Sequence, residues 1–153
     1  MPSEPSSSST VTLKEITADT VRTICNLSVQ DDQKKFVAPN AVSIAQAYFS
    51  ENAWFRAIYA DDCPVGFLML GDQPEKPEYY LWRFMIDQRY QRHGFGRQAI
   101  RLLIDHVKTR PSATELLTSV VQEEGGPQKF YEKLGFELTG DYEEGEAILA
   151  LRL

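Results

Sequence analysis

A glycine turn flanked by arginines is the part of this sequence best suited to chemistry. Gly94 and Gly96 lie between Arg92 and Arg97 in the segment 91–97, QRHGFGR, directly before a helical pattern. A helix N-terminus leaves about four backbone N–H groups without partners and carries roughly half a positive charge. Glycines in that turn let an anion approach the backbone without meeting a Cβ atom. The segment therefore predicts a site for a pyrophosphate.

Two familiar phosphate-binding motifs do not describe this turn. A dinucleotide-binding fold needs an acidic residue about 20 positions further on, at the end of a second parallel strand, whereas Glu115 precedes its strand-like run. A P-loop needs Gly-Lys-Ser/Thr, and Gly96 is followed by Arg97 and Gln98. A glycine turn that packs closely and binds nothing remains the alternative. The gathering of arginines in a chain of net charge −6 favours the phosphate site.

Composition narrows the class of protein. A chain of 153 residues suits one domain with one core. A net charge of −6 gives no electrostatic reason to expect nucleic acid or an anionic membrane as a partner. Cys25 and Cys63 form no metal-ligand spacing and no disulfide framework, so we expect no metal. With no long apolar run and no secretory signal, the expectation is a cytoplasmic protein with a short disordered tail over residues 1–9.

Apolar periodicity predicts the elements that must position the turn. Strands are expected at 10–17, 53–60, 64–70, 79–86, 114–121, 136–142 and 146–153. Helices are expected from a cap at Thr17 or Asp19 to about Ser28, over 44–49 with Ser43 as cap, from Gly96 to about Lys108, and between Pro127 and a left-handed Gly135. Residues 31–40 and 71–78 are expected as a break and a polar loop. The order β-α-α-β-β-β-α-β-α-β-β predicts a mixed α/β domain with antiparallel hairpins and one or two parallel crossovers.

Three segments together resemble one family. The stretch 91–96, QRHGFG, is similar to the Gln/Arg-x-x-Gly-x-Gly/Ala signature of the GNAT N-acetyltransferase superfamily. The segments FMID at 84–87 and FYEKLGF at 130–136 lie where that family has its cofactor strand and its cofactor-helix tyrosine. The resemblance implies a single acyl-CoA N-acyltransferase domain over 10–153. It also implies a mostly antiparallel central sheet, with a splayed cofactor-binding strand and about four flanking helices.

The resemblance implies the residues of an acetyl-CoA site. The acyl end would be lined by Phe84, Met85 and Ile86, with a backbone N–H near Ile86 polarising the thioester carbonyl. The pyrophosphate would be held by the signature residues, Gln91, Arg92, His93, Gly94, Phe95, Gly96 and Arg97. Tyr131 would be the general acid that protonates the leaving thiolate, the alternative being an ordinary aromatic residue of a short helix.

The group that removes the proton from the amine is left open. Many family members use a glutamate on the strand before the GG-P region, where this chain has Ser119. The family's frequent asparagine before the last helix is also replaced by glycine here. We therefore expect a relay through water held by backbone carbonyls, or an acid from elsewhere in the chain.

Within the superfamily, the segments 36–40, 79–87 and 138–153 look most like bacterial spermine/spermidine-type acetyltransferases. Five acids and no base occur between Leu134 and Leu151. A polycation needs acids and aromatic faces, although acids in a terminal hairpin also serve as a solvated edge. The residues expected to bind the substrate are Phe36, Asn40, Tyr80, Trp82 and Glu146.

The expected function is transfer of the acetyl group of acetyl-CoA to a primary amine of a small molecule, a polyamine being one candidate. An acetyltransferase for a protein N-terminus or lysine, and a non-catalytic acyl-CoA-binding sensor, are the alternatives. The family resemblance also makes a homodimer an expectation.

Overall fold

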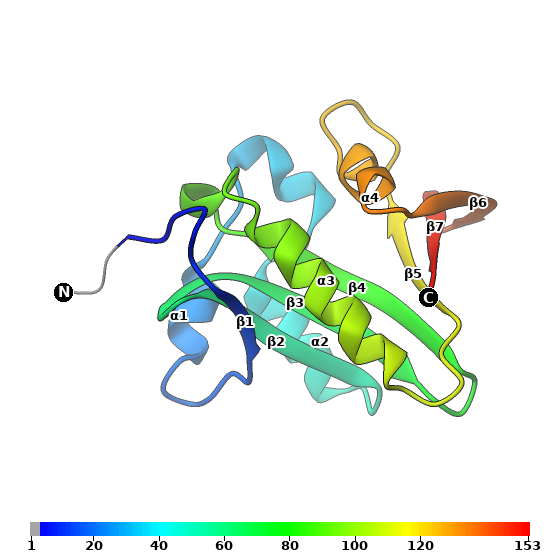
Figure 1. Cartoon of the computed structure of the whole chain (residues 1–153), viewed down its shortest axis with the longest axis horizontal. Helices are drawn as coiled ribbons and strands as arrows, with labels where there is room; N and C mark the ends of the chain where they lie inside the picture. The colour runs from blue at the N-terminus through cyan, green and yellow to red at the C-terminus, as the bar shows by residue number, and fades with distance from the viewer. Residues whose placement is uncertain (1–3) are drawn as a thin grey trace.

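One mixed sheet organises the residues that the computed structural model describes, 4–153 (Figure 1). The strands are β1 (Val11–Lys14), β2 (Ala53–Ala60), β3 (Cys63–Gln73), β4 (Glu78–Ile86), β5 (Glu115–Val120), β6 (Glu137–Glu143) and β7 (Glu146–Arg152). The helices are α1 (Val21–Asn26), α2 (Asn40–Tyr48), α3 (Phe95–Lys108) and α4 (Gln128–Lys133), with short 3-10 helices η1 (Asp31–Phe36) and η2 (Gln88–Tyr90). The predicted order of elements and the mixed, mostly antiparallel class are confirmed.

Two neighbouring strands part in the middle of this sheet. The strand order is β1-β2-β3-β4-β5-β7-β6, and only β4 and β5 run parallel among the described strands. Helix α3 makes the crossover that parallel neighbours require. The pairing of β4 with β5 is limited, in residues 4–153, to Tyr80 with Leu117 and Leu81 with Thr118. Residues 82–86 therefore have no strand on that edge, which confirms the predicted splayed strand.

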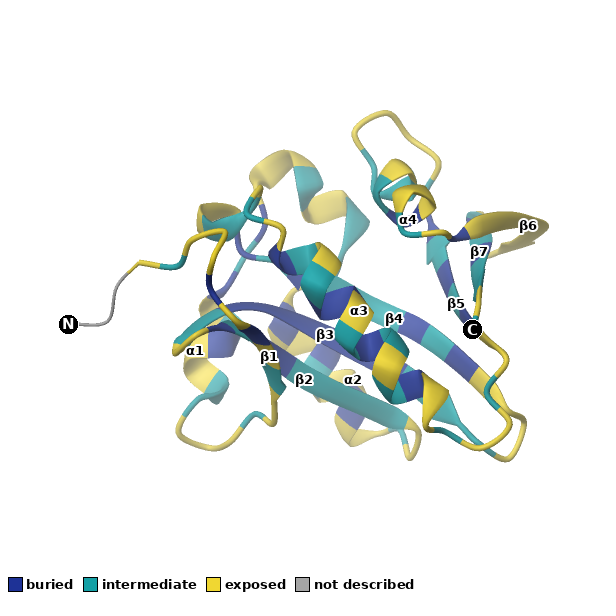
Figure 2. Ribbon diagram, viewed as in Figure 1, coloured by how far each residue is buried: buried dark blue, intermediate teal, exposed yellow. Residues whose placement is uncertain are grey.

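Helices cover both faces of the β1–β4 part of the sheet (Figure 1). On α3, Ile100, Leu103 and Val107 recur at the spacing of one helix face, and all three are buried against the sheet (Figure 2). On the opposite face, Ile24 of α1 packs in a second cluster that includes Met85 of β4. The side chains of β4 thus enter two separate cores, one on each side of the sheet.

Helix α4 ends as the sequence predicts. Gly135 has a φ of 105°, a left-handed conformation that glycine adopts without a Cβ penalty. Its amide donates to the carbonyl of Glu132 over 3.0 Å, and the amide of Phe136 donates to the carbonyl of Tyr131 over 3.1 Å. This pair of bonds is a Schellman motif. It satisfies the last carbonyl groups of the helix and fixes the chain where β6 begins.

Some predicted boundaries are wrong. Helix α2 begins at Asn40, directly after Pro39, whose φ of −56° suits a helix start. Ser43 is therefore not its cap; it is buried inside the helix and its hydroxyl donates to the carbonyl of Pro39 over 3.4 Å. The break predicted over 31–40 contains η1, which is held by a capping box between Gln30 and Gln33.

The loop predicted over 71–78 is shorter in the structure. β3 continues through Gln73 and β4 begins at Glu78, because Gly71 to Gln73 pair with the first residues of β4. The tail predicted over 1–9 lies partly outside the described residues, which begin at Glu4. Within it, the amide of Ser9 donates to the carbonyl of Ser6 over 2.9 Å, so this part of the segment forms a turn before β1.

Candidate active site

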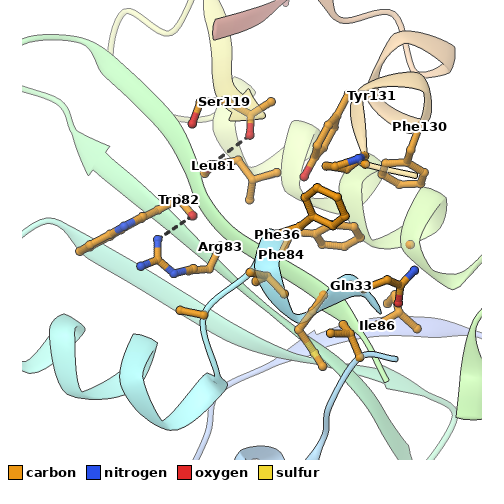
Figure 3. Close-up of a pocket in the computed structure, with 18 of the residues that line it drawn as sticks. Gln33, Phe36, Leu81, Trp82, Arg83, Phe84, Ile86, Ser119, Phe130 and Tyr131 are labelled. Atoms are coloured by element: carbon orange, nitrogen blue, oxygen red, sulfur yellow. Dashed lines mark hydrogen bonds between the residues drawn. The ribbon is translucent and has the colours of Figure 1, made fainter. Parts of the chain in front are cut away.

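A cleft opens where β4 and β5 part (Figure 3). Its volume is about 1270 Å³, and its walls come from β4, β5, η1, the loop before α3, α4, and the turn between β6 and β7. Of the residues predicted for the site, those that line it are Phe36, Tyr80, Trp82, Phe84, Met85, Ile86, Gln91, Arg92, Gly94, Phe95, Gly96, Arg97, Tyr131 and Glu146. The structure brings these residues to one cavity, whereas His93 and Asn40 are not among its lining residues.

The free edge of β4 presents backbone N–H groups to this cleft. The amide of Asp87 donates to the carbonyl of Val65 on β3 over 2.7 Å. Because backbone groups point to alternate edges along a strand, the N–H groups of Ile86 and Phe84 point away from β3 and toward the gap. The carbonyl of Ile86 accepts a hydrogen bond from Gln91 Nε2 over 2.9 Å, which agrees with this orientation. An extended ligand can pair with this edge as an added strand would.

The two glycines of the signature have different structural roles. Gly94 has a φ of 82°, and a Cβ added there would meet nothing within 4 Å, so its open side is available to a ligand. A Cβ on Gly96 would lie 3.1 Å from Phe84 and 3.4 Å from Phe130, so Gly96 lets α3 pack closely against the cleft. Close packing without ligand binding, the alternative raised from the sequence, thus accounts for Gly96. The open backbone expected of a phosphate site is found at Gly94.

The first turn of α3 has the features of an anion site. The first hydrogen bond of the helix is donated by Gln98 to the carbonyl of Gly94 over 3.2 Å, so the amides of residues 95–97 precede the hydrogen-bonded ladder. Arg92 and Arg97 are exposed beside this turn, and neither belongs to an ion pair within residues 4–153. Free amides, the helix dipole and two uncompensated guanidinium groups together fit a diphosphate. His93 packs its ring 5.3 Å from that of Phe95 instead of facing the cleft.

Tyr131 is held in place by aromatic rings. It is only 5% exposed, and its ring centroid lies 5.3 Å from that of Phe130 and 5.4 Å from that of Phe136. The contact with Phe136 accompanies the Schellman motif described above, so the end of α4 orients the phenol. Burial raises the pKa of Tyr131, and the neighbouring Thr118 hydroxyl offsets part of that rise. The phenol therefore carries its proton at neutral pH, as a general acid must.

A serine and a glutamate from different strands meet across the cleft from α4. The hydroxyl of Ser119 on β5 donates to Glu146 Oε1 at the start of β7, over 3.3 Å. Tyr80 lies beside them. Burial raises the pKa of its phenol, and Ser119 offsets part of that rise. The negative charges of Glu143, Glu146 and Glu78 raise the pKa further. The position where the family often has a glutamate is thus occupied by a serine that is bonded to one.

Asn40 has a structural role that the sequence does not reveal. It is 2% exposed, its side-chain amide donates to the carbonyl of Ile24 over 2.9 Å, and the same group lies 3.6 Å from the sulfur of Met85. This arrangement ties the start of α2 to α1 beneath the sheet. The predicted contact of Asn40 with substrate is therefore replaced by a link inside the core.

Several residues of the cleft were not predicted from the sequence, and three of them make polar contacts or carry charge there. Gln33 of η1 accepts a hydrogen bond from Gln91 over 3.0 Å. Thr118 donates to the carbonyl of Leu81 over 3.2 Å at the point where the strands part. Arg83 is a charged residue inside the apolar run YYLWRFMI, a signal that could have identified it. The other two depend on contacts between distant segments, which no local pattern records.

The splayed strand, the amide-lined turn before α3 and the buried tyrosine define the class of enzymes that transfer an acyl group from a coenzyme A thioester. The chain belongs to the acetyltransferase (GNAT) family, whose model matches residues 22–136. It is an acetyl-CoA-dependent N-acetyltransferase.

Individual relatives agree with this assignment. The spermine/spermidine N(1)-acetyltransferase of Bacillus subtilis is 26% identical over 152 residues, which cover 94% of this chain and 99% of that protein. A domain from Methanocaldococcus jannaschii superposes with a TM-score of 0.76 at 17% identity, covering 95% of this chain and 99% of the other. The PaiA N-acetyltransferase of Thermoplasma acidophilum, solved with coenzyme A, gives a TM-score of 0.71 at 14% identity, covering 94% and 99%. At these identities the two structures show a shared fold.

Residues 4–153 contain neither a cluster suited to a metal ion nor a helix suited to a membrane. No cluster of three or more His, Cys, Asp or Glu side chains is arranged to hold a metal ion. No helix in the same range combines the length and the apolar character needed to cross a membrane.

Proposed function

We propose that this enzyme acetylates a primary amine of a small molecule, and that the cleft between β4 and β5 holds both substrates. Acetyl-CoA supplies the acetyl thioester. Its diphosphate would bind the amides of residues 95–97 with Arg92 and Arg97, and its extended arm would pair with the free edge of β4. The observation that carries this proposal is the geometry of that edge, because its free N–H groups lie in the same cleft as Tyr131 and the first turn of α3.

The chemical step needs one donor and one acceptor of protons. The amine nitrogen forms a bond to the carbonyl carbon while the carbon–sulfur bond breaks, and the electron pair leaves with the sulfur. The N–H of Ile86 would stabilise the negative charge that develops on the carbonyl oxygen, a contribution of about 2.7–4 kcal/mol for such donors. Tyr131 would protonate the departing sulfur. Over the whole reaction the ammonium substrate loses two protons. One of them replaces the proton that Tyr131 gives to the thiolate, and the other is released to solvent, so one proton is released per turnover.

The acceptor of the proton would be the pair of Ser119 and Glu146. Only a neutral amine is nucleophilic, so an ammonium must lose a proton before it attacks. The hydroxyl of Ser119 points at the carboxylate of Glu146, and both groups line the cleft. Ser119 can pass the proton of the amine to Glu146. This is the acid from elsewhere in the chain that replaces the family's strand glutamate.

The substrate that accepts the acetyl group would be an amine that is positively charged when it binds. Four glutamates line the cleft on the side of the β6–β7 turn and the start of β4, namely Glu78, Glu143, Glu144 and Glu146. Together with the rings of Tyr80 and Trp82 they can pair and stack an ammonium group. The relative from Bacillus subtilis is named for polyamines, which supports including them among the candidates.

A panel of primary amines tests the proposal. Each amine is incubated with acetyl-CoA, and the free thiol released and the acetylated product are measured. We expect turnover with at least one small amine and a stoichiometry of one thiol per N-acetyl group. Peptides with free N-termini or lysines form the control set. Turnover with peptides alone would transfer the assignment to a protein acetyltransferase, and no turnover with either set would contradict it.

A further inference from the structure

The side chain of Arg83 lines the cleft from the face of the sheet that α2 covers, and it lies on that face because β4 contains a bulge. The register of β3 with β4 pairs Met69 with Arg83 and then Leu70 with Leu81, so Trp82 is an extra residue between them. A bulge of this kind sends two successive side chains to the same face of a sheet. Accordingly, the guanidinium group of Arg83 lies 5.4 Å from the ring centroid of Trp82. Arg83 also donates to Gln46 of α2 over 3.0 Å, which places it on the face that α2 covers (Figure 3).

The contacts of Arg83 leave its charge uncompensated. Nη1 donates to the carbonyl of Trp82 over 3.1 Å and Nη2 donates to Gln46, and both acceptors are neutral. Nε is buried and has no hydrogen-bond partner among residues 4–153. No carboxylate of the described chain lies within 4.0 Å of the guanidinium group. A partly buried guanidinium charge without an anionic partner is costly, so this arrangement favours a ligand that brings a negative charge to the group.

The other cations of the cleft already have a role. On η1, Lys34 pairs with Asp31 over 2.9 Å and Lys35 pairs with Glu123 over 3.3 Å. Arg92 and Arg97 stand at the first turn of α3, where the diphosphate of the proposed donor would bind. Arg83 is therefore the cation of the cleft that remains for the second substrate. Glu146 lines the same cleft without forming an ion pair with Arg83, so the cleft contains both a cationic and an anionic group.

We propose that Arg83 binds a carboxylate of the acceptor, so that the acceptor is an amino acid and not a simple polyamine. A carboxylate can take a two-pronged hydrogen bond from a guanidinium group, and Nη1 and Nη2 of Arg83, which each bond a single acceptor, each retain a second N–H for it. The ammonium end of the same molecule meets the glutamates of the β6–β7 turn. The inference rests on the proposed function, since it names the substrate class of that site.

Pairs of molecules that differ only by the carboxylate test this inference. Each amino acid is compared with the amine left by its decarboxylation: lysine with cadaverine, ornithine with putrescine, and tryptophan with tryptamine. For the best pair, we expect kcat/KM to be about ten- to hundred-fold higher with the amino acid, the range of a charged hydrogen bond that is lost. Equal or higher kcat/KM with the decarboxylated partner in every pair would overturn the proposal.

Substitution of Arg83 gives the second arm of the test. Arg83→Gln removes the charge, and we expect it to lower the ratio of kcat/KM for the amino acid to kcat/KM for the matching amine about ten- to hundred-fold. Arg83→Lys retains the charge and should restore part of the preference. Arg56→Gln is the matched control, since Arg56 also stacks on a tryptophan, 4.2 Å from the ring centroid of Trp54, but does not line the cleft. An unchanged ratio of the two substrates in Arg83→Gln would refute the assignment.

Calorimetric titration of the protein with coenzyme A bound separates this inference from the proposed function. We expect lysine to bind the wild-type protein more tightly than cadaverine, and Arg83→Gln to abolish the difference. Carboxylate-dependent binding without turnover would support the role of Arg83 and contradict the proposed acetylation. Turnover of amines with no carboxylate preference in either assay would leave the proposed function standing and exclude the amino-acid acceptor.

Discussion

The side-chain amide of Gln91 donates to the carbonyl oxygen of Ile86 over 2.9 Å and to Gln33 Oε1 over 3.0 Å. The first residue of the signature thereby joins the end of β4 to η1. The N–H proposed to stabilise the carbonyl oxygen and the loop proposed to hold the diphosphate are fixed to each other by this one side chain. Their relative position is set before any ligand arrives, which lowers the ordering cost of binding.

Replacing Gln91 by methionine should loosen this junction. Two side-chain hydrogen bonds are lost, so we expect the free energy of unfolding to fall by about 1–3 kcal/mol and the KM for acetyl-CoA to rise. Denaturant unfolding and initial-rate kinetics measure the two effects. Gln88→Met is the control, because Gln88 is exposed and lies outside the cleft. Equal losses in both variants would contradict the role assigned to Gln91.

Removal of the Tyr131 hydroxyl should affect chemistry and spare binding. In Tyr131→Phe we expect kcat to fall by about 10²–10⁴-fold, the usual contribution of a positioned general acid, with an unchanged dissociation constant for acetyl-CoA. Tyr142→Phe is the control, since Tyr142 is exposed and bonds Gln122 outside the cleft. A variant that binds acetyl-CoA and turns over at the wild-type rate would exclude Tyr131 as the acid.

The pH profile gives an independent check on Tyr131. Burial raises the pKa of its phenol above the ordinary value of 10.0, so the acid form persists to higher pH than in a free tyrosine. The proton of a general acid is lost only above its own pKa. We therefore expect no decline of kcat between pH 8 and about pH 10 in the wild-type enzyme. A decline centred well below pH 10 that disappears in Tyr131→Phe would contradict this prediction.

A side chain at Gly94 should block the diphosphate. Gly94→Glu places bulk and negative charge on the open side of the turn, and we expect the affinity for coenzyme A to fall by at least about tenfold. Gly140→Glu is a matched control, because Gly140 has a φ of 91°, also has nothing within 4 Å of an added Cβ, and does not line the cleft. It reports the cost of the left-handed backbone alone. Calorimetric titration with coenzyme A measures both, and similar affinities in the two variants would count against the site.

Asp87 links stability to pH. It is 2% exposed, and burial alone would raise its pKa, but hydrogen bonds from Arg89 and from the amide of Ser28 outweigh burial and lower it. A carboxylate whose pKa is lowered on folding stabilises the protein above its unfolded value, near 3.8, and that stabilisation is lost as the pH falls through the folded value. Asp87→Asn should therefore cost about 1–3 kcal/mol at pH 7, and the cost should decrease progressively as the pH falls below 3.8. Thermal unfolding over this range tests the prediction; a cost independent of pH would contradict it.

Features that depend on neighbouring residues could be predicted from the sequence. The turn at Gly94, the apolar face of α3 and the left-handed Gly135 each follow from local spacing, and the structure contains all three. Features that depend on distant segments could not. The bulge beside Arg83 is set by the register of β3, and the bond between Ser119 and Glu146 joins residues of two strands that meet only in the folded sheet.

Asn40 is a residue whose predicted role was wrong because it depends on a distant segment. A polar residue in the segment FVAPN is compatible with a binding role, and only the position of α1 beneath it reveals that its amide is used inside the core. The polarity of a residue could be read from the sequence, but the direction in which its side chain points could not.

The parting of β4 from β5 has a consequence for solvent exchange. The amides of Phe84 and Ile86 face a gap with no strand opposite, whereas the amide of Met85 faces β3. In the free protein, the amide hydrogens of Phe84 and Ile86 should therefore exchange with deuterium much faster than that of Met85. An acyl-CoA arm bonded along this edge would slow that replacement. The free edge of β4 can thus report whether acetyl-CoA is bound, by amide exchange and independently of which amine is acetylated.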